Sequence, residues 1–492
     1  MEKGSIRLQV LAAVSATFAY LTIGTFIGWP SSTCPLLTGQ NSPLPISSEQ
    51  CSWVVAISNF GMLCAPIPTG YLSDLLGRKV VMATATVPFI VSWLMVTLAR
   101  SVEELYIARF MAGLGQGIAF SVGPIYLAEI SEDRIRGAMG TLFQIMLNIG
   151  TLYEYCVGPY VPYATLAISS AVFPFLFLIT FVWMPESPYY LLDKERQKDA
   201  EESLMKLRGV KEKVSVKEEL EMMQLTLDIQ KKEKGSPLDL IRHRGNRKAF
   251  LIVIGLIFCQ AFSGIIAILS YTASIFKSSG SEIDANMSAI IVGIVTLLTS
   301  VASSLLVDRA GRRPLLLLSS AGCSLCMIGL GIYFLYAPVI DKSINIDWIP
   351  LALMIIYIMM FMAGLGPLPW AVAGEILPSN IKGYAIAMAS MTSPALTLIV
   401  VKMFQLLTDG AGTYVVFWIF GVCCGVSTVG ISLFVPETKG KSLLEIYEEL
   451  NKTPDQRSTV CSISTIATTL SSDLEMNKKC FHSSDPHKLV ST

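Results

Sequence analysis

The sequence is poor in charged residues and in histidine. Asp, Glu, Lys and Arg make up 15% of its 492 residues, and hydrophobic residues make up 52%. Soluble domains carry roughly 25% charged residues. Three His, and 11 Cys without a pair of C-x-x-C motifs, give no pattern for a metal site. No nucleophile–base pattern appears either. The composition therefore excludes an ordinary soluble protein and argues against an enzyme, and we expect no metal and no cofactor.

The sequence also has no excess of positive or negative charge. The 37 Lys and Arg balance the 37 Asp and Glu, so the formal net charge is +0. The basic clusters are short and follow apolar runs, which is the pattern of membrane-protein loops rather than of a nucleic-acid surface. We expect no nucleic-acid partner.

The apolar residues occur in long blocks. A bilayer core about 30 Å thick requires roughly 20 apolar residues in a helix, and about twelve blocks reach that length, so the sequence predicts an all-α polytopic membrane protein. The blocks are Leu8–Trp29, Ser52–Leu72, Val80–Leu98, Leu105–Leu127, Met139–Tyr160, Thr165–Met184, Ala249–Ser270, Ala289–Val307, Leu315–Tyr336, Ile349–Val372, Ala385–Leu407 and Tyr414–Val435.

Lys and Arg are distributed unevenly between alternate loops. One set of loops carries basic pairs such as Arg78/Lys79 and Arg312/Arg313, whereas the opposite set offers only Arg100, Lys277 and Lys342. Cytoplasmic loops are enriched in these residues. We therefore expect both termini to be cytoplasmic. We expect the plasma membrane as the location, with an internal membrane as the alternative.

Three short motifs occur twice, roughly 235 to 250 residues apart. "DLLGRK" (74–79) matches "DRAGRR" (308–313), "AEISEDRIRG" (128–137) matches "GEILPSNIKG" (374–383), and "PES" (185–187) matches "PET" (436–438). The repeats keep the same order, so the chain reads as two copies of a six-helix unit. Parallel halves of this kind place a substrate site between them and alternate its access by rocking.

The repeated charges predict ion pairs at the cytoplasmic helix ends. We expect Glu129 to meet Arg78 and Glu375 to meet Arg312. The pairs would hold the halves together when the cytoplasmic side is closed and would separate as the halves rock, because a few kcal/mol moves a two-state equilibrium. The predicted gate comprises Asp74, Arg78, Glu129, Arg136, Asp308, Arg312, Glu375 and Lys382. Solvated helix ends that follow the loop-charge rule are the plainer alternative.

The predicted boundaries follow from these features. Residues 1–184 form the first half, 185–248 a cytoplasmic linker, 249–450 the second half and 451–492 a tail. The linker is highly charged with apolar residues at helical spacing, which predicts amphipathic helices. The Ser- and Thr-rich tail predicts disorder. Cys34 and Cys51 both fall in the first external loop, where a disulfide and two separate thiols fit the sequence equally.

The same motifs, with "PESPYYLL", "GLGPLPWAVAGE" and "PETKGKSLLEI", resemble the sugar porter branch of the major facilitator superfamily, the glucose-transporter-like carriers. The resemblance covers about residues 10 to 450, and "GTFIGWPSS" looks most like its insect facilitated trehalose transporter-like group. It implies the major facilitator fold, with twelve transmembrane helices in two six-helix halves, and transport of a small neutral sugar by a monomer in the lipid bilayer.

The resemblance also implies sugar contacts. Amides donate and accept hydrogen bonds, as a hydroxyl-rich ligand requires, and an indole face can cover a sugar ring. An interhelical hydrogen bond is the structural alternative for a lone membrane Gln. The positions carried over from the family are Gln144, Gln260, Tyr271, Thr296, Trp370 and Ser393.

Several family amides are missing from this sequence. Ala261, Ile266, Thr296 and Ser393 stand where the family has Gln or Asn. Each lost amide removes a hydrogen-bond partner, so the pocket is more apolar than that of a glucose carrier. We therefore leave the sugar open between a hexose and trehalose, with a less polar solute as a further alternative.

Ionisable residues inside the predicted helices bear on energy coupling. Proton-driven relatives carry an Asp in the first helix, where this sequence has only apolar or small residues around Gly24–Gly28. That favours a facilitative carrier. Glu154 and Lys402 fit both a structural role and a role in substrate or proton handling. Arg109 fits a snorkelling cation or a structural partner. The rivals of the facilitative carrier are a proton-coupled symporter and a non-transporting sugar sensor.

Overall fold

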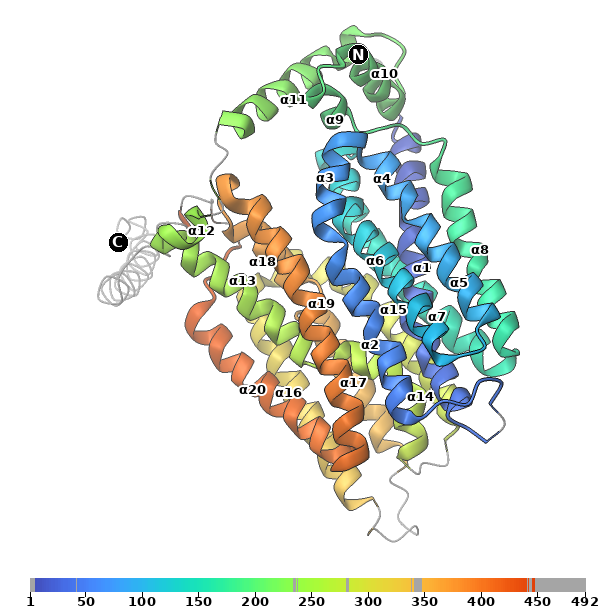
Figure 1. The fold of residues 1–492 in the computed structure, drawn as a ribbon. Helices are drawn as coiled ribbons and strands as arrows, with labels where there is room; N and C mark the ends of the chain where they lie inside the picture. Colours follow the sequence, from blue (N-terminus) through green and yellow to red (C-terminus); the bar gives the residue numbers. More distant parts are fainter. Residues whose placement is uncertain are drawn as a thin grey trace, which may run out of the picture.

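The computed structural model describes residues 5–40, 42–232, 236, 238–279, 283–337, 339, 347–439, 441 and 445–446. Within these ranges the regular structure is helical and contains no strand. Figure 1 shows the helices as one elongated bundle with a small helical group at one end. The tail predicted over 451–492 lies outside the described residues.

Twelve membrane-crossing segments form the bundle, as predicted. The first six are α1 (Arg7–Leu37), α2 with α3 (Ser48–Cys64 and Pro66–Leu76), α4 with α5 (Arg78–Thr84 and Thr86–Leu98), α6 (Val102–Ile130), α7 (Asp133–Val157) and α8 (Tyr163–Phe181). The second six are α13 with α14 (Arg244–Phe262 and Ile265–Ser278), α15 (Ala285–Ala310), α16 (Arg312–Tyr336), α17 with α18 (Ile349–Ala363 and Leu368–Ile376), α19 (Ser379–Gly410) and α20 (Thr413–Phe434).

Ten of these segments are long and apolar enough by themselves to span a bilayer, and the bent pair α2–α3 makes an eleventh. The twelfth is α7, which begins with a charged turn and also carries Glu154. Its first turn shows why the predicted block Met139–Tyr160 started too late: hydropathy does not detect a charged helix start at the interface.

Four crossings consist of two helices where the sequence predicted one, and the joint between α4 and α5 lies at Ala85. The other three are broken as follows. The second bends by 44° after Cys64, where Pro66 has no N–H to donate to the preceding turn. The seventh breaks at Gly264, whose φ of +84° is a left-handed conformation that glycine tolerates. The tenth breaks between Gly364 and Pro367. Breaks of this kind free backbone carbonyls inside the bundle.

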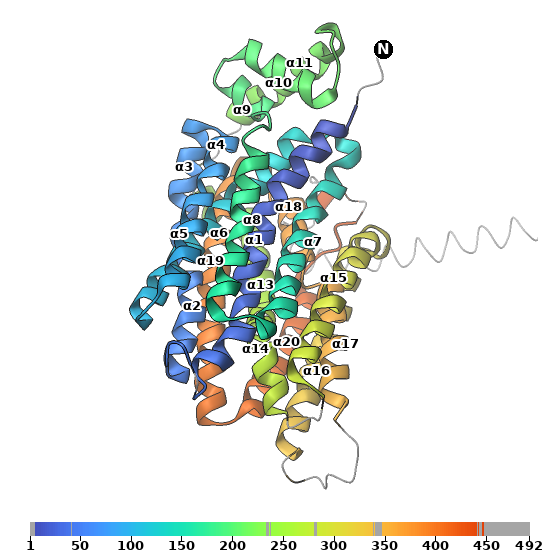
Figure 2. The same cartoon turned by 90° about the vertical axis from the view of Figure 1, so that its right-hand side faces the viewer.

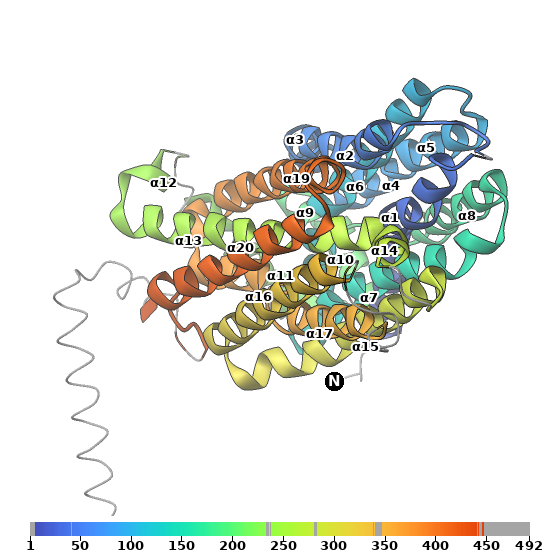
Figure 3. The same ribbon diagram turned by 90° about the horizontal axis from the view of Figure 1, so that it is seen from below.

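Each half is built on close helix crossings. In Figure 3 the helices of the first half lie beside those of the second, and α7 is next to α15.

Inside the first half, α1 and α7 cross closely. A Cβ built on Gly24 would lie 2.0 Å from the Leu147 carbonyl oxygen, and one on Gly150 would lie 2.0 Å from the Leu21 carbonyl oxygen. The backbones of α1 and α7 therefore touch, which is the packing that small residues allow in membranes.

The bundle has two distinct ends. The helical group α9 (Pro188–Asp193), α10 (Gln197–Arg208) and α11 (Val214–Lys232) caps one end (Figure 2), which we call the linker face. The short α12 (Asp239–Arg242) leads from this group into α13. The opposite end carries a disulfide between Cys34 and Cys51 with an S–S distance of 2.06 Å, and we call it the disulfide face.

The linker helices are anchored to the first half. The Arg208 guanidinium, in a residue that is only 8% exposed, pairs with Glu219 on α11 and donates to the Ile130 carbonyl at the end of α6. Gln9 of α1 donates to the Leu207 carbonyl and to Glu132. These bonds join α1, α6, α7 and the linker into one unit.

Replacing Gly150 by Val tests the α1–α7 crossing. The added side chain must push two touching backbones apart, and overpacking of this kind costs about 1–3 kcal/mol. We expect the melting temperature of the detergent-purified protein to fall by several degrees. Gly255→Val is the matched control, because no described atom of another helix lies within 4 Å of a Cβ at that position. An equal effect of both substitutions would contradict the crossing.

Candidate functional site

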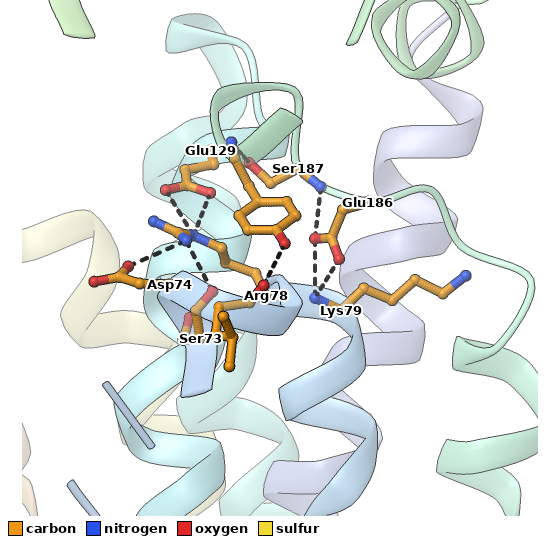
Figure 4. Close-up of polar contacts among 9 residues, drawn as sticks. Ser73, Asp74, Arg78, Lys79, Glu129, Glu186 and Ser187 are labelled. Atoms are coloured by element: carbon orange, nitrogen blue, oxygen red, sulfur yellow. Dashed lines mark hydrogen bonds and ion pairs between the residues drawn. The ribbon is translucent and has the colours of Figure 1, made fainter. Parts of the chain in front are cut away.

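The first copy of the repeated motifs forms a cluster of polar contacts at the linker face (Figure 4). The Arg78 Nε lies 3.3 Å from Oε2 and 3.4 Å from Oε1 of Glu129, at the end of α6. Its Nη1 donates to the Ser73 carbonyl at 3.0 Å and to Asp74 at 3.3 Å. Its guanidinium carbon also lies 5.4 Å from the centre of the Tyr190 ring. Arg78 thus ties α3, α4, α6 and α9 together.

Glu186 fixes the turn that presents Arg78. Its carboxylate accepts the Lys79 backbone N–H at 3.0 Å and 3.2 Å, and Figure 4 shows it facing the start of α4, where N–H groups have no partner within the helix. The preceding Gly77 has φ +101°, and a Cβ there would lie 2.3 Å from a Glu186 oxygen. The Gly-Arg-Lys sequence is therefore a turn shaped around a carboxylate.

The second copy has the same design. The Arg312 Nε donates to Glu375 at 3.1 Å, and its Nη2 lies 3.0 Å from the same oxygen. The Thr438 hydroxyl donates to the other Glu375 oxygen. Gly311, with φ +91°, stands where Gly77 stands in the first copy. The likeness extends from the sequence to the backbone conformation.

Glu437 is the counterpart of Glu186. Its carboxylate accepts four backbone N–H groups, from Arg312 and Arg313 at 3.1 Å, from Thr438 at 3.0 Å and from Lys439 at 2.9 Å. Partial burial alone would raise the pKa of Glu437, but the four donors outweigh it and hold the pKa below the usual 4.5. The ionised form is therefore part of the folded structure.

Each ion pair lies within a single half of the protein. Arg78 and Glu129 belong to the first half, and Arg312 and Glu375 to the second. In this conformer the pairs join neighbouring helices of the same half, and pairing across the halves stays a prediction for a state closed at the linker face. Lys382 donates to the Gly374 carbonyl at 2.6 Å. Arg136 and Asp308 lie outside the residues whose side chains the structure describes.

The two predicted glutamine contacts have different surroundings. Gln260, near the end of α13, donates to the carbonyls of Leu365 at 3.0 Å and Gly366 at 2.8 Å, which are exposed by the break between α17 and α18. The interhelical hydrogen bond that the sequence left as the alternative is thus present. Within the described part of the chain, the Gln144 amide on α7 donates to Asn148, at 3.3 Å. Its amide is held less firmly.

The other four predicted contacts are spread along the bundle. Tyr271, at a kink in α14, is 2% exposed and stacks on Phe404 at 5.2 Å. The Thr296 hydroxyl donates to its own helix. Trp370 on α18 is 38% exposed. Ser393 on α19 contributes its carbonyl to a bond with Thr397. No bond between these four side chains is seen among the described residues. The described part of the chain also contains no group of three or more His, Cys, Asp or Glu residues that could hold a metal ion.

Comparison with known proteins identifies the family. The model of the family "Sugar (and other) transporter" matches residues 10–450. The chain belongs to this family. It is 34% identical to the facilitated trehalose transporter Tret1 of Polypedilum vanderplanki over 449 residues, which are 90% of this chain and 88% of that protein. The Bombyx mori Tret1 is also 34% identical over 449 residues, with 90% and 86% covered.

Solved structures of sugar transporters share the fold. The inward open conformation of the xylose transporter XylE from E. coli matches with a TM-score of 0.74 and 25% identity, over 88% of this chain and 98% of that one. The partially occluded inward open conformation of XylE gives a TM-score of 0.75 at 24% identity, covering 89% and 100%.

The halves of this sugar transporter are joined by polar contacts at the disulfide face. Lys402 on α19 donates to Ser52 on α2 at 2.8 Å, and its Nζ lies 4.3 Å from the centre of the Trp53 ring and 3.9 Å from Glu49. The Lys402 that sequence reasoning left between two roles is therefore a contact between the halves.

Neighbouring residues extend this contact. Gln405 donates to the Ser48 hydroxyl at 2.7 Å, and Ser48 donates to Asp409 at 2.8 Å. We call Ser48, Ser52, Trp53, Lys402, Gln405 and Asp409 the α2–α19 latch. Sequence analysis missed four of its six members and gave Ser52 only as the start of a block, because no repeated motif marks contacts that form only when the halves are packed together.

Two buried ionisable side chains lie inside the first half of the transporter. Glu154 on α7 is 0% exposed; one oxygen accepts from Ser170 at 2.6 Å, and Oε2 has no hydrogen-bond partner among the described residues. Arg109 on α6 is 2% exposed, donates to the carbonyls of Val54 and Phe26 at 3.1 Å, and acts electrostatically on Glu154. A snorkelling role for Arg109 is wrong, because its head group is enclosed by protein.

Replacing Glu437 by Gln tests the anchored carboxylate. A depressed pKa means that the carboxylate stabilises the fold above pH 4.5 and that this contribution is lost as the pH falls through the lower folded value. We expect the variant to melt below the wild type at pH 7.5 and the difference to shrink towards pH 4. Glu202→Gln, on the exposed side of α10, should change neither. A pH-independent difference would contradict the carboxylate's role.

Replacing Lys402 by Ala tests the latch. The substitution removes the hydrogen bond to Ser52 and the cation–π contact, together about 1 kcal/mol, which shifts a two-state equilibrium roughly fivefold. Spin labels at Glu103 and Lys277 should report more molecules with a longer distance at the disulfide face. Lys402→Arg keeps the charge over Trp53 and should restore the shorter distance. An unchanged distance distribution in Lys402→Ala would show that the latch does not hold the halves together at the disulfide face.

Proposed function

We propose that this chain is a facilitative transporter of a neutral sugar, a hexose or trehalose, that works by alternating access of its two halves. The observation that carries the proposal is the pair of matching clusters at the linker face, each closed within its own half. A half that is internally cross-linked can rotate as one body. The names of the relatives, facilitated trehalose transporters, support the substrate class.

The conformer described above supports a direction of access. The polar contacts between the halves described above gather at the disulfide face, where the latch is joined by a bond from the Ala273 N–H to the Ser31 hydroxyl at 3.1 Å. We infer that the disulfide face is closed and that the sugar site opens towards the linker face. The likeness to inward open XylE agrees with this inference.

The charged residues at the linker face would form the gate that closes when the protein changes to the state open at the disulfide face. As the halves rock, Glu129 and Glu375 can exchange partners across the halves. The other charged residues nearby in sequence are Asp74, Arg136, Asp308 and Lys382. Both ion pairs are largely shielded from solvent, with side-chain exposures of 16% and 16% in the first and 17% and 32% in the second. Shielded charges are costly to leave unpaired, so each state must satisfy them.

The sugar contacts in this proposal are Gln144, Gln260, Tyr271, Thr296, Trp370 and Ser393. The Gln260 amide nitrogen donates to two carbonyls of the α17–α18 break. Its carbonyl oxygen could then accept a hydrogen bond from a sugar hydroxyl. A sugar bound there would connect both parts of the broken helix to α13. Its binding would in this way be coupled to the geometry of the break.

The surroundings of the transporter follow from the loop charges and the linker. We propose that the linker face and both termini are cytoplasmic, that the location is the plasma membrane, and that the protein acts as a monomer. Residues 1–184 and 249–450 form the moving halves, and 185–248 travels with the first half because Arg208 and Gln9 anchor it there.

One observation favours proton coupling as a second candidate. Glu154 is a buried carboxyl with an oxygen that has no hydrogen-bond partner among the described residues, and intramembrane ionisable residues often mark proton paths. A related structure is that of the proton:xylose symporter XylE bound to 6-bromo-6-deoxy-D-glucose, with a TM-score of 0.73 and 25% identity over 90% of this chain and 99% of that one. The first-helix carboxylate of proton-driven relatives is absent here, so we place the facilitative carrier first.

Exchange of labelled sugars in proteoliposomes, at equal pH on both sides, tests the proposal. We expect exchange of glucose or trehalose, at least tenfold slower in Gln260→Ala and in Glu129→Gln, and unaffected in Glu202→Gln. Accumulation driven by a pH gradient, lost in Glu154→Gln, would instead establish the symporter. Absence of exchange for every sugar would contradict transport of sugars.

A further inference from the structure

A cavity opens at the disulfide face beside the latch. It encloses about 210 Å³ and lies between the end of α1, the start of α2, α14, α19 and the start of α20. The Cys34–Cys51 disulfide forms part of its wall. Its polar lining consists of hydroxyl and amide side chains, among them Thr38, Ser48, Ser274, Gln405, Thr408 and Thr413. We call this cavity the vestibule.

The vestibule wall carries two hydroxyls that the protein leaves without partners. The Tyr271 hydroxyl and the Thr408 hydroxyl are both buried and have no hydrogen-bond partner among the described residues. A buried hydroxyl without a partner is destabilising, and both residues line this one cavity. They indicate a ligand that donates and accepts hydrogen bonds.

The cavity also offers an aromatic surface. Tyr271 and Phe404 stack with their ring centres 5.2 Å apart and their planes 6° from parallel, and both line the vestibule. An aromatic surface beside neutral hydrogen-bonding groups is suited to a sugar, whose ring has an apolar side and a hydroxyl-rich edge. The cation Lys402 is held by the latch and does not line the cavity, so nothing in the lining selects a charged ligand.

We propose that the vestibule is a second sugar site, which binds one ring of a neutral sugar. It shares Tyr271 with the contacts proposed for the Gln260 site, and none of the other five contacts lines it. The volume supports one ring, because it exceeds the roughly 30 Å³ of a single water several times and is smaller than the roughly 300–1,000 Å³ of pockets for larger ligands. The choice of sugar as the ligand rests on the proposed function.

The site has a consequence for gating. Ser48 and Gln405 line the vestibule and also form the hydrogen bond that joins α2 to α19. A sugar hydroxyl that bonds to either one competes with that bond. Sugar arriving at the disulfide face would therefore loosen the latch and favour the state open on its own side, because a ligand shifts a two-state equilibrium towards the state it binds better.

Sugar protection of a cysteine at the mouth of the vestibule tests the proposal. Ser278 is exposed, lines the cavity and donates to the Ile275 carbonyl of its own helix, so Ser278→Cys should react with a membrane-impermeant maleimide added to the full-length protein in vesicles. We expect glucose or trehalose to slow this labelling. Thr408→Val and Tyr271→Phe, each added to Ser278→Cys, should raise the half-protecting concentration about threefold to tenfold, as loss of one hydrogen bond predicts.

Two controls separate the vestibule from its surroundings. Thr392→Val removes a hydroxyl from the same helix, bonded to its own backbone outside the cavity, and should not change protection. Gln260→Ala should leave protection intact while it slows exchange at least tenfold. Loss of protection in Gln260→Ala, or unchanged protection in both Thr408→Val and Tyr271→Phe, would overturn the second site.

The measurement is independent of transport. Protection without exchange in the otherwise unmodified protein would contradict the proposed transport and keep the vestibule. Exchange without protection by any exchanged sugar would keep the transporter and reject the vestibule.

Discussion

Each half of this protein depends on a carboxylate held by backbone N–H groups beside a left-handed glycine. Glu186 and Glu437 bind the first turns of α4 and α16, where N–H groups lack partners within the helix. Gly77 and Gly311 leave room for those carboxylates because they have no side chain and tolerate a positive φ. The turns then aim Arg78 and Arg312 at Glu129 and Glu375. Without the anchored carboxylates the arginines would have no fixed direction.

The glycine contacts inside the first half differ in kind from the latch contacts between the halves. Inside a half, backbones touch at glycines such as Gly24 and Gly150, and close packing of this sort resists sliding. Between the halves at the disulfide face, the latch consists of hydrogen bonds and one cation–π contact on partly exposed side chains. Such contacts are individually weak and can be exchanged for water or for a ligand. The difference explains how two rigid bodies can move against each other.

The fold could be predicted almost completely from the sequence, because twelve long apolar blocks and three repeated motifs specify two six-helix halves. The helix breaks were missed: hydropathy does not register Gly264 or Gly364 inside an apolar run. The motifs also pointed to Arg78, Glu129, Arg312 and Glu375, which the structure pairs as expected but within each half. Which helix ends meet is a property of packing, and a spacing along the chain does not encode it.

The candidate sugar contacts were less accessible to sequence reasoning. The pattern located Gln260 but not its bonds to the α17–α18 break, because carbonyls freed by a break leave no mark in the sequence. Glu154 was recognised as a charge inside a helix, whereas its position opposite Arg109 and Ser170 depends on how α6, α7 and α8 pack. Ser48, Gln405 and Asp409 look like ordinary loop-end residues until α2 and α19 are brought together.

Alternating access in this protein requires that its two internally cross-linked halves move as rigid bodies. Spin-label distances in lipid nanodiscs, recorded with and without the exchanged sugar, test it most directly. One pair of labels, at Glu103 and Glu202, reports on the first half together with the linker anchored to it, and a second pair, at Glu202 and Lys439, spans both halves at the linker face. We expect sugar to leave the first distance unchanged and to redistribute the second between two values. A first distance that changes together with the second would contradict rigid halves.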